Sequence, residues 1–325
     1  MNKQTNKQRL LIFAALTTFF FVTLFFSSVS AQNPKVLDDL TARNLGAAAS
    51  LVRNYVSISE KERNRQTFFS NLTPREKSSL VRFHLAMQIA QRPHLSEEQK
   101  SLILDSLSGI DGRGYDLRGT DIGDEARSKA DEIQERAKEV FSKYEGAEIF
   151  GKVGGDNMAI SLLGKYRDVV TVQSMCERRE LFKNLTSTEK SNVWKVQLAL
   201  ALAQGENFSR EQQSLIVEAI KVLAPELYLV SSDEQNRKRI SEFLSGMSKR
   251  AVELFGKPTA AKVFAIIGTD DPLPLEGTDC SCSISSNWCA GECSRIGSTC
   301  DITESGCGTF WLYSCNGRCL FSNSQ

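Results

Sequence analysis

The cysteines of this 325-residue chain are concentrated near its C-terminal end. Cys176 is alone in the first 279 residues, and the other eight follow as Cys280, Cys282, Cys289, Cys293, Cys300, Cys307, Cys315 and Cys319. A segment of about forty residues buries too little apolar surface to offset its chain entropy, so disulfides or a metal must hold it in one shape. The sequence therefore predicts a separate, cross-linked module at residues 280–321.

The other end of the chain indicates the compartment. Residues 1–31 combine a basic start (Lys3, Lys7, Arg9), an apolar run over residues 10–26 and small residues up to Ala31, which is typical of a secretory signal peptide. The length of the run leaves an uncleaved membrane anchor as the alternative. We expect signal peptidase to act here and the protein to be secreted, periplasmic or held in the cell envelope.

If the protein is exported, its eight clustered cysteines are expected to form disulfides, because thiols oxidise outside the cytoplasm. Zinc is the alternative, but the segment has one Cys-x-Cys, two Cys-x3-Cys spacings and no histidine. We therefore expect no metal. The sequence does not choose among the possible pairings, except that Cys280 and Cys282 are too close to pair with each other.

Charge excludes one class of partner. Without residues 1–31 the chain carries 37 basic and 39 acidic side chains, and the cysteine module is itself mildly acidic. Nucleic acids and anionic lipid attract strongly basic surfaces. We therefore expect no nucleic-acid partner.

The region before the cysteines contains a duplication. Residues 69–107 and 182–220 align without a gap and are identical at 17 of 39 positions, and the likeness resumes further on, as at Phe141 and Phe255. Two units follow, at residues 50–155 and 163–268. A helical segment at residues 32–49 precedes them.

Both units carry helix-start signals. The segments that begin at Thr73, Ser96, Thr186 and Ser209 have a glutamate or glutamine three residues later, which is the pattern of a capping box. Helices should therefore begin near residues 74, 97, 187 and 210. Apolar residues then recur at helical spacing and predict a buried stripe in each unit: Leu80, Phe83, Met87 and Ala90, and Val193, Val196, Leu200 and Ala203. The expected fold is mainly α, with two duplicated helical-bundle units followed by a small disulfide-rich module.

No residue pattern indicates an enzyme or a cofactor. His84 and His94 correspond to Gln197 and Asn207 in the second unit, so they cannot form a site that both units share. The acidic loop from Asp111 to Glu125 departs from the spacing of calcium-binding loops. The common catalytic and nucleotide-binding motifs are also missing from the sequence.

Residues 269–279 connect the second unit to the module. Asp271, Pro272, Pro274 and Gly277 are typical of an exposed, extended linker and mark a candidate site for a processing protease.

The module resembles a known family of antibacterial peptides. The Cys-Ser-Cys-Ser start at Cys280, the aromatic Trp288, the segment from Gly306 to Tyr313 and the later Asn316-Gly317 are similar to the fulvocin C-related bacteriocins. That family places a Cys-x-Cys pair before the Asn-Gly, whereas here Cys315 alone precedes it and Cys319 follows. The last bridge can therefore differ from the pattern of the family.

The resemblance implies an exported antibacterial effector in the module, which a protease could release from a helical pro-region. Trp288, Phe310, Trp311 and Tyr313 give the module more apolar surface than a disulfide core can hide, so we expect an exposed interaction patch. The alternative is that Trp311 and Tyr313 only pack against the bridges. Such a patch would contact a cell-surface receptor or the membrane interface of target bacteria. The alternative is an exported binding or anchoring protein whose disulfide-rich recognition domain stays attached. A third interpretation is that the helical units mask the patch until release.

Overall fold

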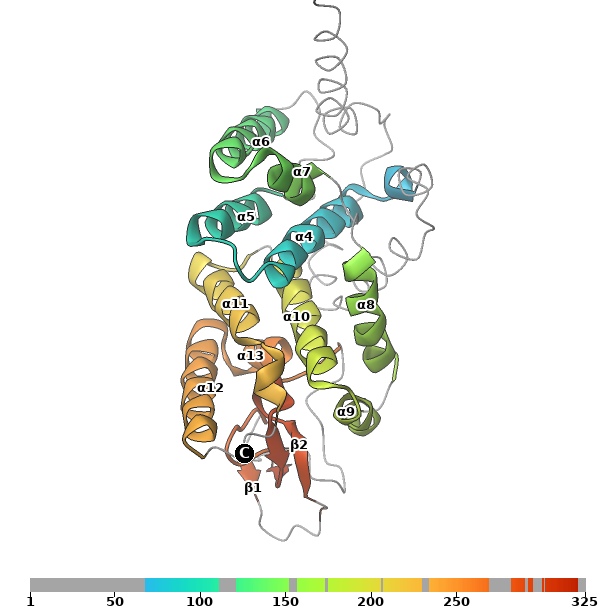
Figure 1. Cartoon of the computed structure of the whole chain (residues 1–325), viewed down its shortest axis with the longest axis vertical. Coiled ribbons are helices and arrows are strands. Elements are labelled where there is room, and N and C mark those ends of the chain that lie inside the picture. The colour runs from blue at the N-terminus through green and yellow to red at the C-terminus, as the bar shows by residue number, and fades with distance from the viewer. Residues whose placement is uncertain are drawn as a thin grey trace, which may run out of the picture.

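The computed structural model describes residues 68–110, 121–151, 157–172, 175–205, 207–229, 234–268, 282–289, 292–294, 300 and 302–320. Helices form most of it, and short strands occur only in the C-terminal part of these residues (Figure 1). The expected fold class is therefore confirmed. The signal peptide, the segment 32–49, the linker 269–279 and Cys280 lie outside the described residues.

The helices of the two units correspond one to one. The first unit contains α4 (Pro74–Gln91), α5 (Glu97–Gly109), α6 (Asp121–Val140) and α7 (Lys143–Gly151). The second contains α10 (Ser187–Gln204), α11 (Arg210–Val222), α12 (Glu234–Phe255) and α13 (Lys257–Phe264). Between α7 and α10 lie α8 (Asn157–Val170) and α9 (Met175–Lys183), of which α9 and most of α8 fall within the second unit, and the short η3 (Pro225–Tyr228) follows α11.

The four predicted helix starts are confirmed. At α10, the Thr186 hydroxyl accepts a hydrogen bond from the backbone of Glu189, and the Glu189 carboxylate accepts one from the backbone of Thr186. The other three starts have the same reciprocal pair. The sequence interpretation missed one further box, in which Ser142 and Glu145 exchange these bonds and start α7. For this reason α6 ends at Val140 and a separate helix, α7, begins at Lys143.

The duplication extends to bonds that tie the helices together. The Ser78 hydroxyl donates to the carbonyl of Ile110 at 3.4 Å, and the equivalent Ser191 donates to Leu223 at 2.5 Å. Two more contacts repeat in the same way. The Gln99 side chain donates to the Val140 carbonyl as Gln212 does to Leu254, and Arg136 donates to the Asp105 carboxylate as Arg250 does to Glu218. Equivalent residues thus fix each bundle in the same way.

The two units share one hydrophobic core. All eight residues of the predicted stripes are buried, and α4 packs along α10 at the centre of the molecule (Figure 1). Arg82 joins the units, because its buried guanidinium donates to the carbonyl of Ala203 at 2.5 Å and also to that of Leu107. The pair of bundles is therefore one array.

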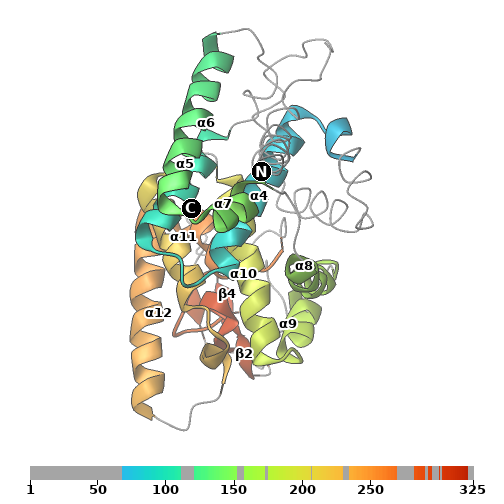
Figure 2. The same cartoon turned by 45° about the horizontal axis from the view of Figure 1, so that its top comes forward.

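The module contains two small antiparallel sheets. Strand β1 (Glu292–Ser294) pairs with β4 (Arg318–Leu320), and β2 (Thr303–Cys307) pairs with β3 (Tyr313–Cys315). A short 3-10 turn, η4 (Thr309–Trp311), lies between β2 and β3. The sheets lie at the end of the array formed by α9, α12 and α13, away from the first unit (Figures 1 and 2).

Candidate functional site: the junction of array and module

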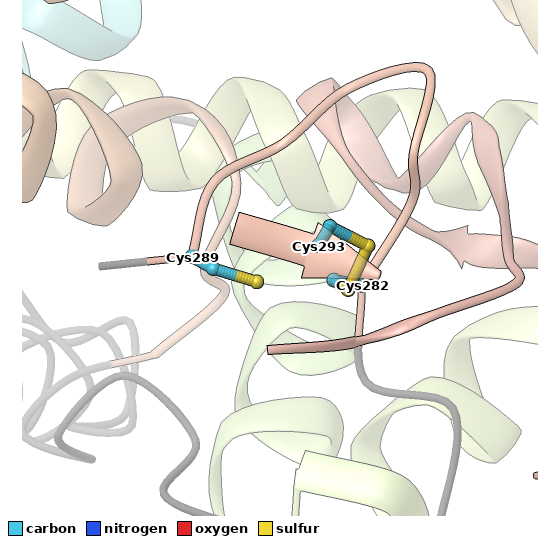
Figure 3. Close-up of side chains that lie close together, drawn as sticks. All are labelled: Cys282, Cys289 and Cys293. Atoms are coloured by element: carbon cyan, nitrogen blue, oxygen red, sulfur yellow. A yellow bond between two sulfur atoms is a disulfide. The ribbon is translucent and has the colours of Figure 1, made fainter. Parts of the chain in front are cut away.

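Disulfides cross-link the module, as the sequence predicts. The described pairs are Cys282–Cys293, Cys289–Cys319 and Cys307–Cys315, and Cys300 is also disulfide-bonded. Cys282 pairs across eleven positions and not with a neighbour in the sequence. The sulfurs of Cys282, Cys289 and Cys293 lie within 4.8 Å of one another, so two of the bridges are adjacent (Figure 3).

The turn η4 inserts two aromatic side chains of the module into the array. Phe310 and Trp311 are 0% and 1% exposed, although both follow a β-strand in a module of only a few dozen residues. Both have positive φ angles, of 53° and 54°, which L residues rarely adopt. This backbone directs the two adjacent rings into the helical core.

Aromatic residues of the second unit receive the turn. The Trp311 ring meets Phe182 and Trp194 edge to face, with centroids 5.1 and 6.0 Å apart. Phe310 makes the same kind of contact with Trp194 at 5.4 Å and with Phe264 at 6.2 Å. Such pairs add about 0.5–1.5 kcal/mol each beyond the burial of their surface. Array and module therefore share one aromatic cluster.

Hydrogen bonds fix the position of the turn. The indole N–H of Trp311 donates to the Ala265 carbonyl at 2.8 Å, just beyond the end of α13. The Tyr228 hydroxyl donates to the carbonyl of Phe310 at 3.3 Å, and the hydroxyls of Ser248 and Thr309 lie 2.6 Å apart. These three contacts join α12, η3 and the segment after α13 to one short turn.

Thr309 is the centre of the polar contacts at the junction. Its hydroxyl is fully buried and accepts a hydrogen bond from the Trp288 indole at 3.1 Å. The backbone N–H of Thr309 donates to the Ser286 hydroxyl at 3.1 Å. The module and α12 thus meet at Thr309, whose buried hydroxyl forms hydrogen bonds with both.

The expectation of an exposed patch is wrong for the intact chain. Phe310 and Trp311 are fully buried, Trp288 is 8% exposed, and Tyr313 is half-buried. The prediction treated the module by itself, without the array. The array covers the apolar surface of Phe310 and Trp311, because Phe182, Trp194 and Phe264 supply the missing aromatic core.

Trp194 marks the difference between the two units. The equivalent residue in the first unit is Val81, which is half-buried, as are Phe69 and Phe150 at the positions of Phe182 and Phe264. In the structure Trp194 packs against both aromatic rings of η4. The second unit therefore has the bulky ring where the module docks.

Burial keeps the tyrosines of the junction neutral. Desolvation raises the pKa of Tyr228 well above its ordinary value of 10.0. Desolvation also raises the pKa of Tyr313, and a hydrogen bond with Ser241 partly opposes that shift. Both side chains act here as apolar rings with a hydroxyl that forms hydrogen bonds.

A groove of about 440 Å³ runs between α12 and the module. It is lined by Ser245, Ser248, Lys249, Val252, Glu253, Ser285, Ser286, Asn287, Trp288 and Tyr313. Both parts of the chain line it, so it exists only while the module is docked.

The other candidate residues are not part of this junction. His84 contacts the Ile149 carbonyl at 3.0 Å, and its counterpart Gln197 donates to the Lys262 carbonyl at 3.3 Å, so both join helices of their unit. His94 is exposed, between α4 and α5. Residues 111–120 and the linker residues Asp271, Pro272, Pro274 and Gly277 lie outside the described part of the chain.

Comparison with protein-family models, curated proteins and solved structures gives no match for this chain. Among the described residues, no helix has the length and apolar character needed to cross a membrane.

Proposed function

We propose that this chain is an exported, bacteriocin-like antibacterial protein in which the helical array holds the effector module in a masked form. The observation that carries the proposal is the burial of Phe310 and Trp311 against Trp194 and its neighbours. Aromatic residues of this kind are the ones that bind a receptor or a membrane interface. In the docked state they are inaccessible.

The proposal requires two steps for activation. A protease cuts the linker at 269–279, and the module then separates from the array. Cleavage alone leaves the aromatic cluster and its hydrogen bonds intact, so the cut protein remains a complex. The mechanism needs neither catalysis nor a cofactor, and the partners are a processing protease and the surface of a target bacterium.

The test is a recognition sequence for a specific protease, inserted within residues 269–279 of the full-length protein. After cleavage of the oxidised protein, size-exclusion chromatography should show array and module eluting together. The module is then separated under denaturing, non-reducing conditions, returned to buffer and assayed for growth inhibition against a panel of bacteria. We expect the separated module to inhibit growth and the cut complex to be inactive.

Matched controls identify the masked surface. A module with Phe310→Ala and Trp311→Ala should lose its activity, whereas one with the exposed Ile284→Ala should keep it. An inactive separated module that retains its disulfides would contradict the effector role. Growth inhibition by the uncut protein would contradict the masking.

The second candidate is an exported recognition protein whose module never leaves the array. The groove favours it, since α12 and the module line that groove jointly. In that case the separated module is inactive, the intact protein binds to bacterial envelopes, and Ser245→Trp, which fills the groove, abolishes the binding.

A further inference from the structure

Two neighbouring bridges bring four cysteine sulfurs together. Those of Cys282, Cys289 and Cys293 lie within 4.8 Å of one another (Figure 3). The sulfur of Cys319 is bonded to that of Cys289. Cys282 and Cys289 are 5% and 2% exposed. Three of the sulfurs therefore form one compact group, with Cys319 bonded to one of them, and two of the four cysteines are buried.

Backbone pairing holds three of these cysteines in place independently of the disulfides. Cys293 lies directly opposite Cys319 in the β1–β4 ladder. Cys282 forms a bridge with Gly317, donating to its carbonyl at 3.2 Å and accepting from Asn316 at 2.9 Å. None of these backbone contacts involves a sulfur atom.

The fourth cysteine is fixed by the junction with the array. Cys289 follows Trp288, whose indole donates to the buried Thr309 hydroxyl, and its own backbone N–H donates to the Asn287 side chain at 2.9 Å. Thr309 is in turn held between Ser286 and Ser248. Docking on the array therefore positions Cys289 in the reduced module as well.

We infer that the reduced form of the docked module binds one zinc ion through Cys282, Cys289, Cys293 and Cys319. Tetrahedral zinc sites with four thiolates have Zn–S bonds of about 2.3 Å, which places the sulfurs about 3.8 Å apart. The sulfur of Cys289 already lies within 4.8 Å of the bonded sulfurs of Cys282 and Cys293, close to this spacing. The bonded sulfurs reach it by rotation of the side chains after reduction.

The chemistry balances with a dithiol or phosphine reductant. Each of the two bridges accepts two electrons and two protons, giving four thiols while the reductant is oxidised. Zinc binding then displaces the four thiol protons and forms four Zn–S bonds, because the thiolate is the metal ligand. The same four cysteines can thus cross-link the module in two ways, through two disulfides when they are oxidised or through one metal ion when they are reduced.

The experiment uses the full-length protein, reduced by a phosphine under anaerobic conditions and titrated with Co²⁺ and then Zn²⁺. We expect one cobalt per chain with the visible spectrum of a tetrahedral thiolate site, which zinc abolishes. The double variant Cys289→Ser with Cys319→Ser should bind zinc at least about 100-fold more weakly. The matched pair Cys307→Ser with Cys315→Ser removes a separate bridge and should bind zinc as the wild type does.

Alkylation of the wild-type protein tests the same site without a variant. Zinc should protect Cys282, Cys289, Cys293 and Cys319 from a thiol reagent, and Cys307 and Cys315 should react as they do without metal. Absence of a tetrahedral cobalt spectrum, or equal protection of all six cysteines, would overturn the inference. The result does not depend on antibacterial activity.

Discussion

The indole N–H of Trp311 donates a 2.8 Å hydrogen bond to the backbone carbonyl of Ala265, 46 positions earlier in the chain. Both residues are buried, and the bond joins the C-terminal module to the end of the last array helix. Because the bond links two parts that differ in composition and architecture, the array and the module should unfold as one unit.

Replacing Trp311 tests this joint stability. Trp311→Ala should lower the free energy of unfolding by about 3–5 kcal/mol, because it leaves a cavity between Phe182 and Trp194. Trp311→Phe should cost less, about 1–3 kcal/mol, mainly because the Ala265 carbonyl loses its donor. Chemical denaturation followed by circular dichroism measures the array helices. A helical transition unchanged in Trp311→Ala would show that the two parts unfold independently.

Trp194→Val gives the second unit the residue found in the first. The variant should be about 2–4 kcal/mol less stable, since the ring fills the space between the array and η4. Its indole nitrogen has no hydrogen-bond partner among the described residues, so the loss comes from packing alone. After cleavage of the linker, the module should leave this variant more readily than the wild type in size-exclusion chromatography. The control, Val81→Ala in the first unit, should not change release.

Gly308 determines whether η4 can form. Its φ is +71°, and a Cβ there would lie 2.6 Å from the Tyr313 ring and 2.7 Å from Ser286. Gly308→Ala should therefore lower the free energy of unfolding by at least about 1 kcal/mol. Gly246→Ala is the matched control, because it lies in α12 with open space around it and should raise stability by about 0.5–1 kcal/mol. Equal effects in thermal denaturation would rule out this role for Gly308.

The capping box of α10 predicts a dependence on pH. Hydrogen bonds from the backbone and hydroxyl of Thr186, together with Lys165, hold the pKa of Glu189 below its ordinary value of 4.5. A carboxylate whose pKa is lowered on folding stabilises the protein above the unfolded value, and this contribution is lost as the pH falls through the folded value. Glu189→Gln keeps the capping geometry, so its stability should fall less between about pH 5 and pH 2.5.

Urea denaturation at a series of pH values measures this difference. In a plot of the free energy of unfolding against pH, Thr186→Ala should reduce the slope over the same acidic range. It should also lower the free energy of unfolding by about 1 kcal/mol at neutral pH, because the helix loses its cap. Parallel curves for the wild type and Glu189→Gln would contradict the assignment.

The helical array was predictable because its signals are local. The capping boxes at Thr73, Ser96, Thr186 and Ser209 fix where helices begin, and the 3.6-residue period fixes the buried face. The missed box at Ser142 carries the same signal, Ser-x-x-Glu, and could have been found by the same reasoning. The cysteines likewise indicated a cross-linked module.

The junction could not be predicted in the same way. An aromatic pair such as Phe310-Trp311 has the same sequence whether it faces solvent or another part of the chain. Its burial depends on Trp194, more than a hundred positions earlier, and on positive φ angles at Phe310 and Trp311. Neither residue type favours positive φ, so the sequence did not predict this backbone. One signal was present, since Trp194 is the bulky replacement for Val81 in the duplicated unit. This replacement indicated a position at which the two units differ, but it did not indicate that the module packs there.

The left-handed backbone at Phe310 and Trp311 makes the docked module and the free module different antigens. Each residue holds a conformation that costs about 1–3 kcal/mol, and the contacts with the array compensate for it. Once those contacts are gone, the turn relaxes and the two rings take new directions. An antibody raised against the separated module and directed at this turn would therefore bind the intact protein poorly, and it would distinguish the two forms.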